Sequence, residues 1–330
     1  MRKVIVTTDR VGAENLARLA GYAEVVEGWK LKEAEIPGVL PQVDAALVLG
    51  WPTYFTPENL AAMKRLKFIQ TMSVGVNQVR FQDLPAGVKV SSNAGAYSTE
   101  VAEHAWGLLL DSAKRIAVAN AAIREGGQTI DDFRADLKDV VVLKGKTLGI
   151  VGYGGIGRAV AKFAVSFGMK VLAFGRGAAK ERGTKVYHGK AGLDGVLRLS
   201  DALLIAVPLT KSTERMIGAR ELSLMKKSAL LVNVARGDIV DQKALHDHLV
   251  THPSFRYATD VWWSKEGRET LETEKPFGNL PNFVGTPHTS GPAAVVGGEP
   301  QASAVTNTIR YLRGLRPKNV VDPTEYPSRL

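Results

Sequence analysis

The chain of 330 residues contains no cysteine. This absence excludes disulfide bonds, a thiolate nucleophile and a cysteine-based metal site, and we expect no metal centre. No apolar run reaches the roughly 18 residues that span a bilayer, so the sequence predicts neither a transmembrane helix nor a membrane partner. The N-terminus reads Met-Arg-Lys-Val-Ile-Val, a β-strand pattern instead of a signal peptide, which predicts a cytoplasmic protein.

Positive charge exceeds negative charge: 43 Lys and Arg against 33 Asp and Glu give a formal net charge of +10. Such an excess raises the question of nucleic-acid binding. The basic residues are scattered, however, and no basic run is interleaved with aromatic residues. We therefore expect no nucleic-acid partner, because attraction of anionic cofactors and substrates is a sufficient reason for the charge.

The most informative stretch is KTLGIVGYGGIGR at residues 146–158. A short apolar strand is predicted at residues 148–151, and Gly152, Gly154 and Gly157 follow with G-x-G-x-x-G spacing. In a dinucleotide fold the first glycine permits a tight turn, the second lets a pyrophosphate approach the backbone, and the third lets helix and strand pack closely. A helical pattern follows, and its N-terminus would offer N–H groups to the pyrophosphate. This context favours a Rossmann-type site over an ordinary glycine-rich turn.

Strands and helices alternate along the chain, which predicts an α/β fold with parallel sheets. The organisation changes near residue 95, and 330 residues are many for one core, so we predict two α/β domains. Ligands of such sheets bind beyond the carboxyl ends of the strands. The strongest helical pattern covers residues 98–117. The predicted strands cover residues 4–7, 45–49, 68–72, 88–91, 148–151, 170–174, 202–207, 229–234, 257–261 and 282–285.

Two loops of the first domain are candidates for substrate binding. The loop at residues 73–77 follows a strand. It either holds a carboxylate through the backbone N–H groups of Val74 and Gly75 or is a plain turn. A second loop follows the strand at residues 45–49 and carries three aromatic residues that either line an apolar side-chain pocket or belong to the core: Trp51, Tyr54 and Phe55.

The residue after the second Rossmann strand indicates the cofactor. An NAD site normally places Asp or Glu about twenty residues after the glycines, where it binds the ribose 2′-hydroxyl. Here that place holds Gly175, with Arg176 next to it. A guanidinium binds a 2′-phosphate that a carboxylate would repel, so Arg176 favours NADP. The alternative is an NAD enzyme with a surface arginine at this position.

Three more polar residues lie at predicted strand ends of the second domain: Arg236, Asp260 and His288. Histidine titrates near working pH, so His288 is a candidate proton donor. Arg236 is either a reactive residue or a surface residue in a salt bridge. His104, on the long predicted helix, is more typical of a packed or surface histidine than of a catalyst.

With these motifs in this order, the chain resembles the D-2-hydroxyacid dehydrogenase family over nearly its whole length. The resemblance extends to Asn93, to Val101-Ala-Glu103 on the long helix and to the tail Asn319-Val-Val-Asp322-Pro. The Gly175-Arg176 pair is similar to that of NADPH-preferring glyoxylate/hydroxypyruvate reductases.

The resemblance implies two Rossmann-like lobes, a flavodoxin-like substrate domain and an NAD(P)-binding Rossmann domain, with the active-site cleft between them. Residues 1–95 together with 293–330 would form the substrate-binding domain, and residues 96–292 the dinucleotide-binding domain. The resemblance also implies a homodimer, with the helix that begins near Ser98 at the interface.

The resemblance further assigns roles to the site residues. Arg236 would orient and polarise a 2-keto acid, His288 would exchange the proton, and Val74 and Gly75 would hold the substrate carboxylate. Asp260 would contact the nicotinamide carboxamide. Further cofactor contacts are implied for Gly155, Ile156, Val207, Pro208, Thr213, Val234, Ala235 and Gly291.

The sequence departs from the family at the carboxylate that pairs with the histidine. The family places a glutamate five residues after the Asp of its Asp-Val motif, where it fixes the histidine's tautomer. Here that position is Lys265, and Glu266 comes one residue later. We predict that a shifted loop brings Glu266 to His288. Glu269 as the partner, or a pair altered by Lys265, is the alternative.

The sequence thus predicts an NADP-preferring oxidoreductase that reversibly transfers a hydride between nicotinamide and C2 of a small 2-keto or 2-hydroxy acid. One alternative keeps the fold but changes the substrate to phosphoglycerate, phosphite or formate. A formate enzyme of this design uses glutamine as the partner of the histidine, and the loop after Asp260 contains none. The other alternative is a non-catalytic dinucleotide-sensing protein.

Overall fold

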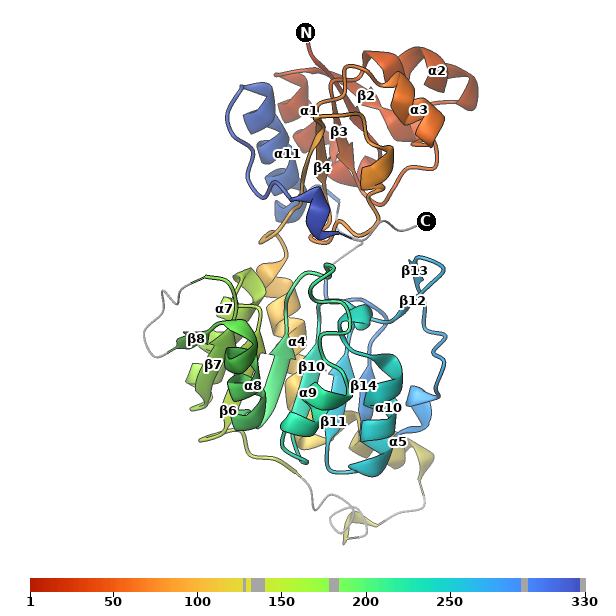
Figure 1. Cartoon of the computed structure of the whole chain (residues 1–330). Coiled ribbons are helices and arrows are strands. Elements are labelled where there is room, and N and C mark those ends of the chain that lie inside the picture. Colours follow the sequence, from red (N-terminus) through yellow and green to blue (C-terminus); the bar gives the residue numbers. More distant parts are fainter. Residues whose placement is uncertain (127–128, 132–139, 178–183, 292–295, 327–330) are drawn as a thin grey trace. The chain divides into compact units, whose positions relative to one another are not determined.

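The computed structural model describes residues 1–126, 129–131, 140–177, 184–291 and 296–326, and it divides into two compact units. Unit 1 comprises Met1–Tyr97 and Pro292–Leu330, and unit 2 comprises Ser98–Gly291. Each unit contains a parallel sheet flanked by helices (Figure 1), which confirms the predicted α/β class. Over the residues described, no helix is both long and apolar enough to cross a bilayer.

Unit 1 is built on a five-stranded parallel sheet with the order β2-β1-β3-β4-β5. This order is that of flavodoxin-like folds, in which the sheet is wound in both directions from a central strand. The strands are β1 (Lys3–Val6), β2 (Glu24–Glu27), β3 (Ala45–Val48), β4 (Phe68–Thr71) and β5 (Lys89–Ser91); the helices are α1 (Ala13–Ala20), α2 (Ile36–Val39), α3 (Pro57–Ala62) and α11 (Glu299–Leu312).

Both faces of the unit 1 sheet are covered, because alternate residues of each strand point to opposite sides. On one face Val4 and Val6 pack with Leu19 of α1 and Val305 of α11. On the other face Ile5 joins a second cluster that includes residues of α3. The last helix of the chain therefore completes the core of the first unit.

Unit 2 is built on a seven-stranded parallel sheet with the order β14-β11-β10-β9-β6-β7-β8. The run from β8 to β11 reproduces the 3-2-1-4-5-6 order of the dinucleotide fold, with β14 added at the edge. The strand order reverses beside β6, which is where such folds bind ligands. The strands are β6 (Thr147–Val151), β7 (Lys170–Phe174), β8 (Lys185–Tyr187), β9 (Ala202–Ile205), β10 (Leu230–Asn233), β11 (Arg256–Thr259) and β14 (Phe283–Gly285).

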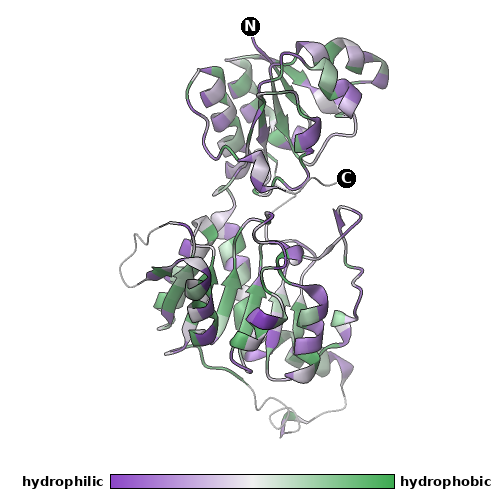
Figure 2. Ribbon diagram, viewed as in Figure 1, coloured by the Kyte–Doolittle hydropathy of each residue, from purple (hydrophilic) through white to green (hydrophobic). Residues whose placement is uncertain are grey.

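Helices cover both faces of this sheet. Helices α4 and α7 pack together, with α4 against β10 and β11, while α8, α9 and α10 contribute to the buried cluster on the other face. Figure 2 shows the apolar strands enclosed by helices with polar outer sides. The helices are α4 (Ser98–Lys114), α5 (Ile116–Glu125), α7 (Gly155–Ser166), α8 (Gly189–Leu199), α9 (Ala219–Leu224) and α10 (Gln242–Thr251).

The predicted helix over residues 98–117 is wrong at its C-terminal end. Helix α4 ends at Lys114, because Arg115 adopts a left-handed backbone conformation with φ 56°. The Asp111 carboxylate accepts a hydrogen bond from the N–H of Ala117 at 2.6 Å. This side-chain cap satisfies a backbone donor in the first turn of α5, so the chain starts a second helix where the periodicity predicted a single one.

Candidate active site

The glycine-rich loop connects β6 to α7, and its three glycines occupy three different environments. A Cβ at Gly152, where φ is 106°, would lie 2.4 Å from the carbonyl oxygen of Ala206. A Cβ at Gly157 would lie 2.2 Å from the carbonyl oxygen of Gly152, so this glycine permits close packing of helix on strand. A Cβ at Gly154 would meet no atom within 4 Å. Open space at Gly154, directly before the helix N-terminus, fits a dinucleotide pyrophosphate.

The other predicted cofactor residues follow the carboxyl ends of neighbouring strands. Arg176 is exposed just beyond β7. Beyond β9, the Thr213 hydroxyl donates to the carbonyl of Pro208 at 2.7 Å and accepts from the N–H of Thr210 at 2.8 Å, which fixes this loop. Val234 and Ala235 directly follow β10. These residues and the glycine loop thus lie along one edge of the unit 2 sheet. Lys180 and Arg182, two further cations near Arg176, lie outside the described residues.

Arg236 follows β10 at the same edge and is half-buried. Asn233 fixes this turn: its Nδ2 donates to the carbonyl of Arg236 at 2.9 Å, and its Oδ1 accepts from the N–H of Ala235 at 3.0 Å. A Cβ at Gly237 would lie 2.3 Å from the carbonyl carbon of Trp262. Only glycine allows this approach, which brings the Arg236 turn against the segment that follows β11.

The structure pairs His288 with Glu269, and the prediction of Glu266 is wrong. His288 Nδ1 lies 2.6 Å from Glu269 Oε2. The other carboxylate oxygen of Glu269 accepts the N–H of Trp262 at 2.6 Å. Lys265 does not disturb the pair, because its ammonium lies 3.2 Å from Glu272.

A short hairpin explains why Glu269 takes the place predicted for Glu266. Strands β12 (Ser264–Lys265) and β13 (Arg268–Glu269) pair antiparallel, and the two residues between them, Glu266 and Gly267, have φ values of 52° and 75°. Positive φ at both positions is the geometry of the tight two-residue turn that joins twisted strands. The hairpin points Glu266 outward at its tip and returns the chain so that Glu269 reaches the histidine.

The surroundings of Glu269 keep its carboxylate ionised. Burial alone would raise the pKa of Glu269, but the hydrogen bond and charge of His288, the N–H of Trp262 and the charge of Arg236 together hold it below its ordinary value. A carboxylate accepts hydrogen bonds and cannot donate them. The proton between the two side chains therefore lies on His288 Nδ1, which leaves Nε2 as the ring nitrogen for chemistry.

Asp260 anchors the loop that carries His288. Its side chain is fully buried, one oxygen accepts the Thr286 hydroxyl at 2.6 Å and the N–H of Thr289 at 2.9 Å, and the other accepts the N–H of Ser290 at 2.8 Å. Burial would raise the pKa of Asp260, but these hydrogen bonds outweigh it and lower the pKa below its ordinary value. The predicted contact of Asp260 with a nicotinamide carboxamide stays a prediction, as does the role of Gly291, the last residue of unit 2.

In unit 1 the predicted substrate loop follows β4 and is held by its own side chains. The Ser73 hydroxyl donates to the carbonyl of Gly75 at 2.7 Å and accepts from Gln78 Nε2 at 2.9 Å. The side chain of Val74 is exposed. The loop is thus a fixed turn with an exposed tip.

The loop after β3 carries Trp51, Tyr54 and Phe55, for which the sequence left open either an apolar pocket or the core. Phe55 is a core residue with 1% exposure. Trp51 and Tyr54 are half-buried and each packs edge-on against Phe55, with ring centroids 5.4 Å apart. Burial raises the pKa of Tyr54 to about 12. The loop is therefore mainly part of the hydrophobic core of unit 1.

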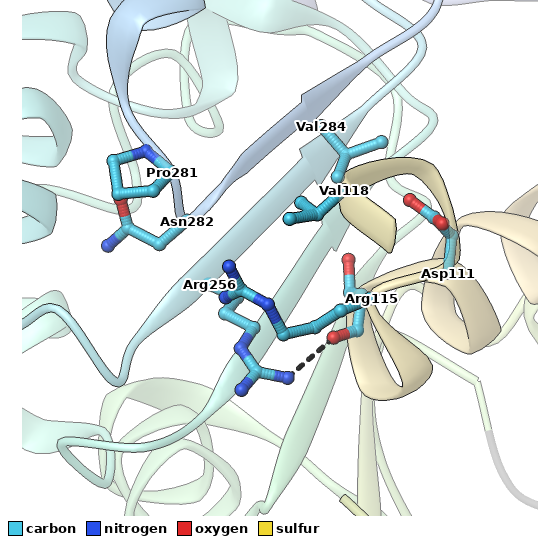
Figure 3. A pocket seen from close by; sticks show the side chains of 8 residues that line it. Asp111, Arg115, Val118, Arg256, Pro281, Asn282 and Val284 are labelled. Atoms are coloured by element: carbon cyan, nitrogen blue, oxygen red, sulfur yellow. Dashed lines mark hydrogen bonds between the residues drawn. The ribbon is translucent and has the colours of Figure 1, made fainter. Parts of the chain in front are cut away.

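A further pocket lies at the opposite edge of the unit 2 sheet (Figure 3). Arg256, the first residue of β11, donates from Nη1 to the carbonyl of Ser112 at 2.7 Å and so ties this strand to α4. Asp111 and Arg115 at the end of α4 complete the polar side of the pocket. Because it opens at the amino ends of parallel strands, this pocket lies away from the edge where the glycine loop, Arg236 and His288 gather.

Reasoning from the sequence ranked Glu269 second to Glu266 as the partner of His288, and it missed the anchoring of the His288 loop by Asp260. The stretch Lys265-Glu266-Gly267-Arg268 contains a signal that favours Glu269 as the partner of His288. Glu-Gly between polar strand residues is compatible with a two-residue hairpin turn, which would bring Glu269 back toward the histidine. The buried anchoring of the His288 loop by Asp260 had no local signal. It depends on residues 26 to 30 positions apart meeting at one end of β11 and β14.

The parallel sheet with this strand order and the glycine loop define unit 2 as a dinucleotide-binding unit of the Rossmann class. A family model described as "D-isomer specific 2-hydroxyacid dehydrogenase, NAD binding domain" matches residues 106–290, more than half of the chain. The chain therefore belongs to the D-isomer specific 2-hydroxyacid dehydrogenase family, and its expected resemblance to that family is confirmed.

Named relatives cover most of the chain. It is 32% identical to a glyoxylate reductase of Thermococcus litoralis over 98% of this chain and 97% of the relative. It is 35% identical to a hydroxypyruvate reductase of Thermotoga maritima over 78% of this chain and 81% of the relative. A crystal structure from Pyrobaculum aerophilum, of a protein provisionally described as a formate dehydrogenase, matches with a TM-score of 0.82 at 31% identity and covers 99% of this chain and 100% of its own.

Proposed function

We propose that the chain is an NADP-preferring 2-keto acid reductase of the glyoxylate/hydroxypyruvate type. It reversibly transfers a hydride between C4 of the nicotinamide and C2 of a small 2-keto or 2-hydroxy acid. The observation that carries the proposal is the pairing of His288 with an ionised Glu269, with Arg236 at the same edge of the sheet. A dinucleotide-sensing protein without catalysis would not need a proton donor oriented in this way.

The cofactor supplies the hydride, and the protein residues orient the substrate and move one proton. During reduction, Arg236 binds and polarises the keto acid and stabilises the negative charge that develops on its C2 oxygen. His288 donates its Nε2 proton to that oxygen, so the product is the 2-hydroxy acid, and the imidazole regains a proton from solvent. Glu269 keeps the Nδ1 proton in place and stabilises the charged ring before transfer. The reverse steps oxidise the hydroxy acid.

The glycine loop supports the proposal for the cofactor. Gly154 and the N–H groups of Gly155, Ile156 and Gly157 at the start of α7 would receive the pyrophosphate. Arg176, exposed beyond β7 where an NAD site has a carboxylate, would bind the 2′-phosphate. Unit 2 is thus proposed as the dinucleotide-binding domain. Unit 1 is proposed as the substrate-binding domain, with Val74 and Gly75 holding the substrate carboxylate.

A homodimer in the cytoplasm belongs to the same proposal. The resemblance places the helix that begins at Ser98, α4, at the interface. Helix α5, which directly follows α4, supports self-association, because none of its residues, all of them described, is buried. Its Ile116 and Ile123 are 56% and 70% exposed. Apolar side chains gathered on a surface mark association sites.

The proposal is tested by following the oxidation of NADPH and of NADH in the presence of glyoxylate, hydroxypyruvate, pyruvate, phenylpyruvate or 3-phosphohydroxypyruvate. Formate is tested in the opposite direction, by following the reduction of NADP⁺ and of NAD⁺. We expect turnover of glyoxylate or hydroxypyruvate, with NADPH preferred at least about tenfold, since a 2′-phosphate bound by Arg176 forms charge-assisted hydrogen bonds. In the variant Arg176→Ala the preference for NADPH should fall toward unity, while turnover with NADH stays the same.

Turnover of phosphohydroxypyruvate or formate alone would show that the proposed substrate is wrong and would replace it. Binding of NADPH without turnover of any compound would favour the sensor.

A further inference from the structure

His104 lies on α4 and faces the loop that carries His288, although the sequence around it is typical of a packed histidine. Its side chain is 24% exposed. Its Nε2 lies 2.9 Å from the Thr286 hydroxyl and 3.4 Å from the buried carboxylate of Asp260. A helix remote in the sequence thus contacts the base of the proposed proton-donor loop.

The geometry defines the direction of the hydrogen bonds in this cluster. The Thr286 hydroxyl has one proton to donate. Its oxygen lies 2.6 Å from Asp260 Oδ1, which is closer than the 2.9 Å to His104 Nε2. The hydroxyl therefore donates to the carboxylate and accepts from His104, which must carry a proton on Nε2. Three groups form a directed chain, in which His104 donates to Thr286 and Thr286 donates to Asp260.

The loop that this chain supports holds His288 in an unfavourable backbone conformation. His288 has φ 54°, in the left-handed region that non-glycine residues adopt only when their surroundings impose it. Its N–H donates to the carbonyl of Thr286 at 3.0 Å. On the other side, Trp262 Nε1 donates to the same carbonyl at 2.9 Å. Thr286 is therefore the point at which this loop is fixed from both sides.

We propose that His104 is a positioning residue that acts through Thr286 and Asp260 to hold His288 in the conformation needed for proton transfer. The inference rests on the proposed function, because it assigns a role in the same reaction. The polar partners of His104 are Thr286 and Asp260, so its effect is on the placement of the imidazole of His288 and not on the chemistry of the proton. Small misplacements of a catalytic group reduce the rate by up to about a hundredfold.

The first test compares His104→Leu, which removes the donor, with His104→Gln, whose amide nitrogen can replace Nε2. Glu103→Gln, on an exposed neighbour in the same helix, is the matched control. We expect His104→Leu to lower kcat about ten- to a hundredfold with KM for NADPH unchanged, His104→Gln to restore most of kcat, and Glu103→Gln to equal the parent. An unchanged kcat in His104→Leu would overturn the inference, and so would an equal loss in the Leu and Gln variants.

A second test asks whether the effect passes through Thr286. If it does, the double variant His104→Leu with Thr286→Val should lose no more activity than the Thr286→Val variant alone, because the chain is already broken. Losses that multiply would overturn the proposed route.

A third measurement does not depend on turnover, and so separates failure of this inference from failure of the proposed function. The N–H groups of Thr289 and Ser290 donate to Asp260. Their hydrogen exchange should accelerate at least about tenfold in His104→Leu, and should be unchanged in Glu103→Gln. If no keto acid is reduced by the parent protein, faster exchange would still support the positioning of the loop. Unchanged exchange in His104→Leu would contradict it.

Discussion

Glu266 and Glu269 lie three residues apart in one hairpin, and the backbone between them decides which one meets His288. The carboxylate of Glu269 has two partners, His288 Nδ1 and the N–H of Trp262, so both of its oxygens are fixed. An oriented carboxylate of this kind determines which ring nitrogen of the histidine faces the substrate. Both residues are glutamates, so the path of the hairpin backbone, and not the type of side chain, decides which of them pairs with His288.

The variant Glu269→Gln should lower kcat for keto acid reduction by about a hundred- to ten-thousandfold, the range that general acid catalysis contributes. The amide keeps the shape of the side chain but removes the negative charge that stabilises protonated His288. Steady-state kinetics at saturating NADPH measure the loss, with Glu266→Gln as the control at the tip of the same hairpin. Equal losses in both variants would show that the pairing seen here is not the catalytic one.

Asp260 should make stability depend on pH in the acid range. Hydrogen bonds lower its pKa in the folded state below its ordinary value of 3.8, so its contribution is complete above that pH and is lost as the pH falls through the folded-state pKa. We expect Asp260→Asn to cost about 1–3 kcal/mol at pH 7, the cost of disrupting buried hydrogen bonds. Urea unfolding should show this difference shrinking below about pH 4. The exposed Asp9→Asn provides the control, and a constant difference between Asp260→Asn and the parent across the pH range would contradict the prediction.

The identity of most candidate residues could be predicted from the sequence, because each follows an apolar run that reads as a strand. Gly152 and Arg236 are examples of this pattern. The contacts of these residues could not be predicted in the same way. Thr286 and His104 meet across 182 positions of the chain, and no local pattern encodes such a meeting. The same limit applies to Glu269, since one hairpin turn shifts the register of every residue after it.

At the level of elements, the glycines of the loop between β6 and α7 have two different roles. One glycine is required by the packing of the fold, and another leaves space for the cofactor. Gly157 is needed by the fold, because a side chain would collide with the backbone of Gly152. Gly154 has open space around it and an ordinary backbone conformation, with φ −86°. We therefore expect the protein to tolerate a methyl group at Gly154 in the absence of cofactor.

The variants Gly154→Ala and Gly157→Ala should therefore fail in different ways. Gly157→Ala should lower the free energy of unfolding by about 1–3 kcal/mol or more, as overpacking does. Gly154→Ala should change it by less than about 1 kcal/mol, since a helix N-cap tolerates the change at about that cost. It should still weaken NADPH binding at least tenfold, because the methyl group occupies the space of the pyrophosphate. Thermal unfolding and fluorescence titration with NADPH distinguish the two, and normal NADPH binding by Gly154→Ala would refute the proposed cofactor site.

The hairpin of β12 and β13 shows how a short element can set the position of one side chain without changing the fold. Its strands are two residues each, and its turn needs one glycine, Gly267, and one residue that tolerates positive φ. The ion pair of Lys265 with Glu272 lies on its exposed side and contributes little in water. The main effect of this small hairpin is thus to place Glu269 beside His288.

At the scale of the molecule, the proposed homodimer gives a mass of twice 35.6 kDa in solution. Ile123→Asp, near the C-terminal end of exposed α5, should shift the population toward the monomer, because it places a charge where an apolar contact is expected. Light scattering after size exclusion measures this, and Val250→Asp on the exposed side of α10 is the control. A parent protein that elutes as a monomer, or a dimer that Ile123→Asp leaves intact, would rule out α5 as the contact.

The return of α11 to unit 1 has a consequence for how the protein is made. During synthesis on the ribosome, β1, β3 and β4 emerge early, but the face of their sheet that Ala304 and Val305 cover must wait until the end of the chain has been translated. Unit 2 is continuous in sequence and can fold in between. The nascent chain thus carries an incomplete, apolar-faced first unit throughout the synthesis of the second. A chain terminated shortly before Glu299 would keep the complete glycine loop and His288 and would still lack the cover of its first sheet.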